Sequence, residues 1–214
     1  MKNFSWLLVA LLVFLIGAPI ADDLGLMSAP FTRAAMFSWL VTVGVWSLRG
    51  FGAYFRFGLV FAVAGIVLNV LAANFSPSIY AYGSMAAIVG FLFLAIWCTL
   101  KQVVFSDEVS TNRLVGAISL YLMLGVLWAV SYAAVEMMNP GSFDGVATIG
   151  PLGWSSDWLY FSFVTMTTLG YGDIGPISAV ARALAYMQAL FGQFYIAILV
   201  AGLVSTYISD RNRP

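Results

Sequence analysis

The chain has 214 residues, of which 62% are hydrophobic and only 8% are charged. Nine basic and nine acidic residues balance to a formal charge of zero, so the basic surplus typical of nucleic-acid-binding proteins is missing. There is no histidine, and the single cysteine, Cys98, excludes an intrachain disulfide and leaves few ligands or bases for a metal or catalytic site. The composition favours an integral membrane protein and disfavours an enzyme.

Six apolar runs are candidates for spanning helices, which need about 20 residues each. They cover Phe4–Ala21, Ala34–Leu48, Phe57–Ala73, Ile79–Leu100, Leu114–Val135 and Ala179–Tyr207. The first run also has features of a signal peptide, with Lys2 in front of it. Because Pro19 occupies position −3 of the only suitable cleavage site, we expect a retained helix. The sequence therefore predicts an all-α integral membrane protein with six transmembrane helices.

The basic residues predict an orientation for these helices. If Lys2 is cytoplasmic and the spans alternate, seven of the nine basic residues lie inside, and only Arg33 and Arg182 lie outside. This distribution satisfies the positive-inside rule. We therefore expect a multi-pass protein of the cell membrane with cytoplasmic N- and C-termini.

The segment between the fifth and sixth spans, residues 136–177, lies on the outer face in this topology. It begins with a Pro/Gly-rich loop, continues as a short helix in "SSDWLYFSFVTMTT" capped by Ser155 or Ser156, and breaks at "LGYGDIGP". The helix is too short to cross the bilayer, so it should be re-entrant. Irregular backbone at membrane depth is tolerated where it is buried in protein or lines a water-filled cavity, which indicates a pore.

The sequence "TTLGYGD" at residues 167–173 suits a site for a dehydrated cation. Backbone carbonyls replace a hydration shell if consecutive residues turn them towards one axis, and ordinary strands alternate their direction. Gly170 and Gly172, on either side of Tyr171, can adopt the left-handed conformations that turn every carbonyl inward. Thr168 can add its hydroxyl to its own carbonyl. Trp158, Tyr160 and Phe161 are expected to receive the Tyr171 ring.

This stretch resembles the selectivity filter of potassium channels, with Leu169 where valine is common. The wider sequence "YFSFVTMTTLGYGDIGP" is similar to the pore loop of prokaryotic potassium channels, and the resemblance extends over roughly the last 100 residues. It implies that backbone carbonyls coordinate permeant K⁺ ions, with no organic cofactor. The implied ligands are Thr168, Leu169, Gly170, Tyr171 and Gly172, supported by Thr167, Tyr160 and Asp173.

One departure from the family bears on the outer mouth of the filter. Val164 stands where some members carry a glutamate, so a carboxylate pair with Asp173 is missing. By resemblance, Tyr160 is the expected partner of Asp173, through a bond from its hydroxyl to the carboxylate. The alternative is that Asp173 is solvated and Tyr160 only packs.

The last span contains features that the resemblance links to gating. Gly192 matches the position at which the family's inner helix often bends, although a glycine there also allows close helix packing. Gln193, Ile196, Val200 and Val204 recur at helical spacing and are candidates for lining the inner pore. If they line it, the valines could close it by dewetting; contact with lipid or protein explains the same stripe.

The first four helices offer no voltage sensor, because the fourth run contains no arginine. We expect a four-helix module at 1–105 without voltage-sensing charges, a cytoplasmic linker at 106–113 and a pore domain at 114–214. The short tail after Tyr207 leaves no room within this chain for a ligand-binding regulatory domain, so such control would come from an unidentified regulatory subunit.

One chain supplies one filter strand, whereas a ring around a cation needs four, so a homotetramer in the lipid bilayer is expected, without a nucleic-acid partner. Acidic residues in the outer segment would concentrate cations at the mouth; they are Glu136, Asp144, Asp157 and Asp173. The predicted function is passive, potassium-selective conduction without classical voltage gating. The alternatives are a subunit of a potassium transporter, a less selective cation channel, or a non-conducting membrane scaffold.

Overall fold

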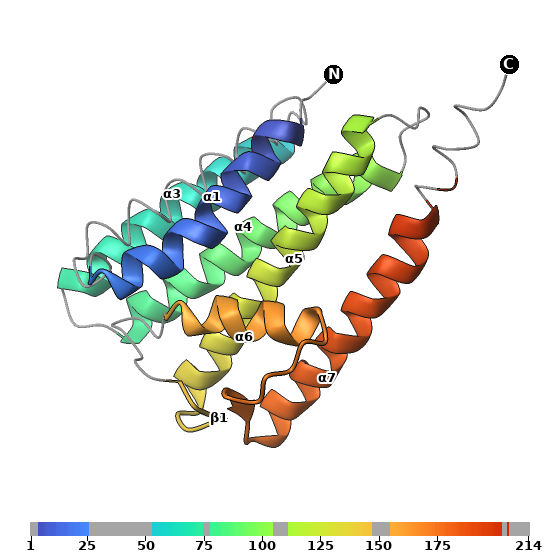
Figure 1. Cartoon of the computed structure of the whole chain (residues 1–214). Coiled ribbons are helices and arrows are strands. Elements are labelled where there is room, and N and C mark those ends of the chain that lie inside the picture. Colours follow the sequence, from blue (N-terminus) through green and yellow to red (C-terminus); the bar gives the residue numbers. More distant parts are fainter. Residues whose placement is uncertain are drawn as a thin grey trace, which may run out of the picture.

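The computed structural model describes residues 4–25, 53–74, 78–104, 111–146, 155–202 and 205. Helices make up most of them (Figure 1). These are α1 (Phe4–Asp23), α3 (Ala53–Asn74), α4 (Ser78–Val104), α5 (Thr111–Met138), α6 (Asp157–Met166), α7 (Ala179–Phe194) and the π-helix η3 (Tyr195–Val200). Two short strands complete the described elements, β1 (Phe143–Asp144) and β2 (Gly175–Pro176).

Four of the described helices are long and apolar enough to cross a bilayer, over Phe4–Ala21, Tyr54–Ala72, Ile79–Val104 and Thr111–Met138. They coincide with four predicted spans, and the mostly helical membrane architecture is confirmed. The helices extend past the apolar runs because backbone hydrogen bonding continues into polar residues at their ends. The predicted span Ala34–Leu48 lies outside the described residues, as does part of Ala179–Tyr207. The count of six therefore stays a prediction.

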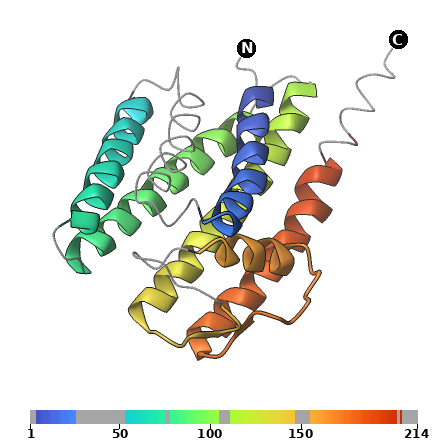
Figure 2. The same cartoon turned by 60° about the vertical axis from the view of Figure 1, so that its left-hand side comes forward.

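The N-terminal helices pack around α5 of their own chain. Helices α1 and α4 both contact α5, while α3 packs on α4 (Figure 2). Small residues permit the close approach that helix packing in a membrane requires. A Cβ at Gly90 would lie 2.9 Å from the Phe61 ring, and one at Gly116 would lie 2.9 Å from the Phe4 ring. The backbone amide of Phe4 also donates to Asn112 Oδ1 at 2.9 Å, which ties α1 to the start of α5.

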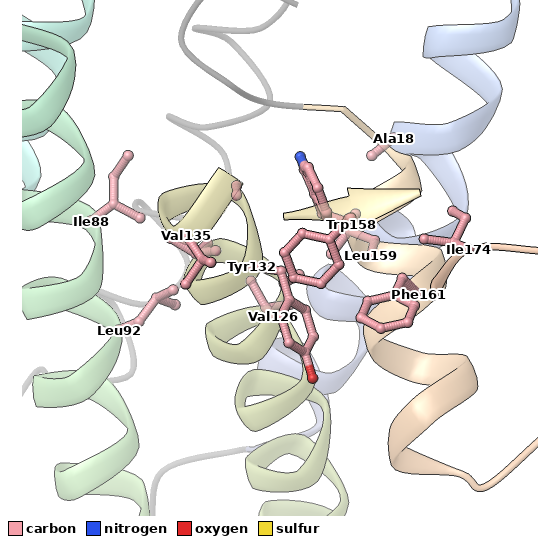
Figure 3. Close-up of a cluster of buried hydrophobic side chains, with 14 of the residues drawn as sticks. Ala18, Ile88, Leu92, Val126, Tyr132, Val135, Trp158, Leu159, Phe161 and Ile174 are labelled. Atoms are coloured by element: carbon pink, nitrogen blue, oxygen red, sulfur yellow. The ribbon is translucent and has the colours of Figure 1, made fainter. Parts of the chain in front are cut away.

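An aromatic cluster forms the centre of the buried core between α5 and α6 (Figure 3). Trp158 and Tyr132 are fully buried, and Phe161 and Phe143 are almost so. Their rings meet edge to face, at 5.1 Å for Phe143–Trp158 and 4.8 Å for Tyr132–Phe161, which is the favoured geometry for aromatic pairs. This cluster fixes α6 across the C-terminal half of α5 (Figure 1), and Ala18 of α1 also contributes to the core.

Helix α6 begins at the expected serines. Ser156 occupies the N-cap position, but the hydroxyl that accepts the Asp157 amide, at 3.2 Å, belongs to Ser155. Helix α7 begins with a second serine cap, where Ser178 Oγ accepts the Ala181 amide at 3.2 Å. These caps satisfy amides that have no partner within the first turn.

The strands bring the loop after α5 against the chain that follows the TTLGYGD segment. In the antiparallel pair, Phe143 lies opposite Pro176, and Asp144 lies opposite Gly175. The Ser142 carbonyl also accepts the Ile177 amide at 2.8 Å. The Pro/Gly-rich loop predicted from the sequence thus contains a strand and a fixed contact at its start.

Candidate functional site

The segment 167–173, called here the filter segment, is hydrogen-bonded to carbonyls in the last turn of α6. The Thr167 amide and hydroxyl both donate to the Phe163 carbonyl, at 3.0 and 2.6 Å. The amides of Leu169 and Gly170 both donate to the Val164 carbonyl, at 2.9 and 3.3 Å. The position of the filter segment is therefore set by the C-terminal turn of α6.

Left-handed backbone recurs at every second residue of the filter segment. The φ angles are +59° at Thr168, +59° at Gly170 and +81° at Gly172. Alternating hand along a chain reverses every second peptide plane, which allows successive carbonyls to face the same side. This is the backbone geometry that the sequence predicts for the two glycines.

Thr168 extends the alternation to a residue that the glycine pattern did not indicate. Among the described residues, it is the only one other than glycine with a positive φ. A β-branched residue in this region is an outlier and costs about 1–3 kcal/mol, so the surrounding structure must impose the conformation. The signal in the sequence is positional, since Thr168 continues the two-residue repeat of Gly172 and Gly170.

The outer end of the filter segment carries the expected bond between Tyr160 and Asp173. The Tyr160 hydroxyl donates to Asp173 Oδ2 at 2.6 Å, and the ring of Tyr171 stacks on that of Tyr160 at 6.4 Å between centroids. Trp158 and Phe161 do not receive Tyr171 as expected, because both pack in the aromatic core. In the single chain Tyr171 remains 67% exposed.

The bond between Tyr160 and Asp173 perturbs both side chains. It lowers the pKa of the Asp173 carboxyl below its usual 3.8 and raises the pKa of Tyr160 to about 12. The bond is therefore present above the folded-state pKa of Asp173 and is lost as the pH falls through that value. At the alkaline end it is lost when Tyr160 ionises. Across neutral pH the contact is intact.

We predict that Tyr160→Phe raises the pKa of Asp173 towards 3.8, because the hydroxyl is the main group that stabilises the charged carboxylate. A carboxyl titration of Asp173 by NMR measures the change. Tyr82→Phe is the matched control, since it removes a tyrosine hydroxyl on α4 that contacts the Met137 carbonyl at 3.4 Å. An unchanged Asp173 titration in Tyr160→Phe would contradict the assignment.

Gly192 lies where α7 crosses the C-terminal end of α6. A Cβ at this position would lie 2.4 Å from the Met166 carbonyl oxygen. This close approach supports the interpretation that Gly192 allows close helix packing. The alternative, that Gly192 is a hinge, stays a prediction. The π-helix η3 begins three residues later, at Tyr195, whose hydroxyl donates to the Ala117 carbonyl of α5 at 2.6 Å.

The candidates for lining the inner pore are only partly described. Gln193 and Ile196 are exposed on the surface of the single chain. Val204 and the side chain of Val200 lie outside the described residues. An apolar constriction at these valines stays a prediction.

Glu136 corrects the expectation that four acidic residues face the outer solution. Its side chain is buried, with 5% exposed, and its oxygens accept the amides of Gly141 at 2.7 Å and Phe143 at 3.1 Å. The carboxylate therefore fixes the turn between α5 and β1. Asp144 and Asp173 are exposed as expected.

A buried polar network behind the filter segment was missed by the sequence interpretation. The Tyr132 hydroxyl of α5 donates to Gln188 Oε1 of α7. Gln188 Nε2 donates to the carbonyl and the hydroxyl of Ser162 in α6, at 3.0 and 2.8 Å. The sequence signal was an amide side chain one helical turn before Gly192, within an apolar run.

No group of three or more His, Cys, Asp or Glu side chains that could hold a metal ion occurs in the described part of the chain. The backbone carbonyls of the filter segment are the candidate ligands for a cation. Carbonyl oxygens suit a weakly bound monovalent ion that must also leave the site.

Residues 119–209 match a family model described as "Ion channel". "Two pore potassium channel c" of Oryza sativa subsp. japonica is 40% identical over 90 residues, which are 42% of this chain and 18% of that protein. "Two-pore potassium channel 2" of Arabidopsis thaliana is 37% identical over 99 residues, 46% of this chain and 20% of that protein. No solved structure matches.

A bacterial relative is also similar. "Inward rectifier potassium channel Kirbac3.1" of Paramagnetospirillum magnetotacticum is 35% identical over 83 residues, 37% of this chain and 24% of that protein. The chain spans about a fifth of the length of the plant relatives it matches. The sequence alone suggested a resemblance to prokaryotic potassium channels. The relatives include plant channels, so the resemblance is not specific to prokaryotes. Residues 119–209 therefore match the ion channel family, and the relatives that are similar to them are potassium channels of plants and of a bacterium.

Proposed function

We propose that the protein is a potassium-selective channel that conducts passively across the membrane. The observation that carries this proposal is the alternating hand of Thr168, Gly170 and Gly172 directly after a short, buried-core helix. It is the backbone conformation that lets neighbouring carbonyls replace the hydration shell of K⁺. The names of the relatives support K⁺ as the ion. The family is one of channels and not of enzymes.

The conduction path is formed by four copies of the chain around a central axis. One chain supplies one filter strand, and α7 with η3 leaves large apolar side chains uncovered. Val180, Phe194 and Ile198 are 60%, 60% and 71% exposed. A neighbouring copy or lipid would cover this face. The seven basic residues that follow the positive-inside rule support cytoplasmic termini in the cell membrane.

Gating does not use a classical voltage sensor. Within α4 the only basic residue is Lys101, in the last turn. Its ammonium lies 5.1 Å from the Trp97 ring centroid and 5.4 Å from that of Tyr54, so cation–π contacts hold it at the end of α4 that the expected topology assigns to the cytoplasmic surface. A charge held there does not cross the field. An unidentified regulatory subunit stays compatible with this arrangement.

The test is bilayer recording of the purified, reconstituted chain under opposed K⁺ and Na⁺ gradients, with native mass spectrometry to count subunits. The wild type is expected to reverse near the K⁺ equilibrium potential and to be a tetramer. Gly170→Ala should reduce the K⁺/Na⁺ permeability ratio about tenfold, because an L-residue at φ +59° costs about 1–2 kcal/mol.

Gly175→Ala is the matched control, since Gly175 has no positive φ and a Cβ there would meet nothing within 4 Å. It should keep the wild-type reversal potential. Equal K⁺ and Na⁺ permeability in the wild type would favour a less selective cation channel. Uptake of K⁺ against its gradient would favour a transporter subunit, and no flux at all would favour a scaffold.

A further inference from the structure

We propose that Gln188 is a positioning residue that couples the inner helix, α7 with η3, to the filter segment and thereby sets the K⁺/Na⁺ selectivity of the pore. The effect on selectivity rests on the proposed function. The positioning of the filter segment by Gln188 does not. It concerns the buried network of Tyr132, Gln188 and Ser162 described above.

Gln188 connects three helices through one amide group. Its oxygen accepts the hydroxyl of Tyr132 from α5, and its nitrogen donates twice to Ser162 of α6. The Ser162 hydroxyl in turn donates to the Gly125 carbonyl of α5 at 2.7 Å. Gln188 and Ser162 are both fully buried, with 0% exposed. Any displacement of α7 relative to α6 must therefore stretch or break this network.

The cost of breaking these bonds is high at this place in the fold. A buried polar group without a partner loses the solvation it would have in water, and membrane-embedded protein supplies few substitutes. An apolar core of the same shape would pack these helices without that risk. A fully satisfied network, by contrast, fixes one relative position of its members. The packing of these helices alone does not require the hydrogen-bond network, which indicates that the network fixes their relative position.

Ser162 lies directly before the residues that hold the filter segment. The next two carbonyls along α6, those of Phe163 and Val164, accept the amides of Thr167, Leu169 and Gly170. A shift of α6 at Ser162 therefore reaches these amides through one turn of helix. Because cation selectivity depends on where the carbonyls stand, the position of α6 is the quantity that Gln188 controls.

A second contact in the same direction supports the coupling. Gly192, one turn beyond Gln188, lies so close to the end of α6 that a Cβ there would be 2.4 Å from the Met166 carbonyl oxygen. The Tyr121 hydroxyl of α5 also lies 3.4 Å from that carbonyl. Helix α7 therefore contacts α6 at two points one turn apart, which transmits rotation of α7 as well as translation.

The experiment compares Gln188→Met with Gln102→Met in the full chain. Both variants replace glutamine by an apolar side chain of similar shape, but within the described part of the chain the Gln102 side chain on α4 bonds only the Cys98 carbonyl of its own helix, at 3.2 Å. Gln188→Met is expected to reduce the K⁺/Na⁺ permeability ratio about tenfold, because the loss of its three hydrogen bonds lets α6 shift. Gln102→Met should leave the ratio unchanged. The ratio comes from the reversal potential and is independent of how much protein folds.

A readout without conduction separates this inference from the proposed function. Amide hydrogen exchange in peptides covering residues 164–172 should accelerate in Gln188→Met and stay at the wild-type rate in Gln102→Met. If the wild type is not K⁺-selective, the proposed function fails, and the exchange result alone decides whether Gln188 positions the filter segment.

A third variant distinguishes positioning from mere stabilisation. The triple variant Tyr132→Phe/Ser162→Ala/Gln188→Met removes all the polar side-chain groups of the network together. No side-chain group is then left without its partner, so thermal stability should recover towards the wild type. Positioning predicts that selectivity stays low and exchange stays fast. Recovery of selectivity together with stability would overturn the proposal. So would Gln188→Met with wild-type selectivity, or with wild-type exchange.

Discussion

Replacing Gly145 with alanine is expected to cause a severe loss of the proposed K⁺ selectivity and a lower melting temperature. Gly145 has φ +82°, and a Cβ built there would lie 2.0 Å from the Asp173 carbonyl oxygen and 3.1 Å from Ile174 Cα. Both are backbone atoms, one in the last residue of the filter segment and one in the residue after it, so no side-chain rotation relieves the overlap. The chain at Asp173 must move, and the bond from Tyr160 moves with it.

Gly141→Ala is the control that isolates this contact. Gly141 has φ +83°, but a Cβ there would meet nothing within 4 Å. Both substitutions therefore carry the left-handed penalty of about 1–2 kcal/mol, and only Gly145→Ala displaces the filter segment. Thermal unfolding and reversal potentials measure the two effects. Similar results for the two variants would show that the loop after α5 does not support the outer mouth.

Replacing Gly192 with alanine is the second substitution with a large expected effect. In an open helix the change would stabilise by about 1 kcal/mol, because alanine is the better helix former. Here the Cβ would lie 2.4 Å from the Met166 carbonyl oxygen and 3.0 Å from Met166 Cγ. Helix α7 must separate from α6, so we expect a less stable protein with reduced conduction.

The sign of the stability change in Gly192→Ala distinguishes packing from hinge bending. If Gly192 serves mainly as a hinge, alanine should stiffen the inner helix, preserve or raise thermal stability and reduce open probability. Gly202→Ala is the control, because Gly202 is exposed and a Cβ there would meet nothing within 4 Å. It should be neutral or slightly stabilising in thermal unfolding. A Gly192→Ala protein as stable as the control would reject close packing as the role of this glycine.

Much of the fold could be predicted from the sequence because a membrane helix is marked by a local run of apolar residues. The runs that begin at Phe4 and Leu114 differ from α1 and α5 by only a few residues at their ends. Helix α6 was equally visible, since its serine cap and its glycine break are close to it in sequence. The bond between Tyr160 and Asp173 was expected from a family resemblance and not from composition.

Other features were not predicted because they depend on how the chain turns after a helix ends, which hydropathy does not indicate. Glu136 is an acid at the end of an apolar run and was expected to face solvent, but the turn that follows α5 folds back and gives it two amides. Thr168 takes a left-handed conformation that its own side chain disfavours. Only the surrounding chain imposes it.

By itself, the sequence determined that this is a helical membrane protein with a glycine-punctuated segment between apolar runs, because hydropathy and backbone freedom are local properties. The tertiary structure decided which side chains support that segment. Gln188 meets Ser162 across 26 positions and Tyr132 across 56, and Gly145 lies close to the Asp173 carbonyl beside the β1–β2 pair. These contacts arise from how α5, α6 and α7 cross, and crossing geometry follows from the packing of all three surfaces at once.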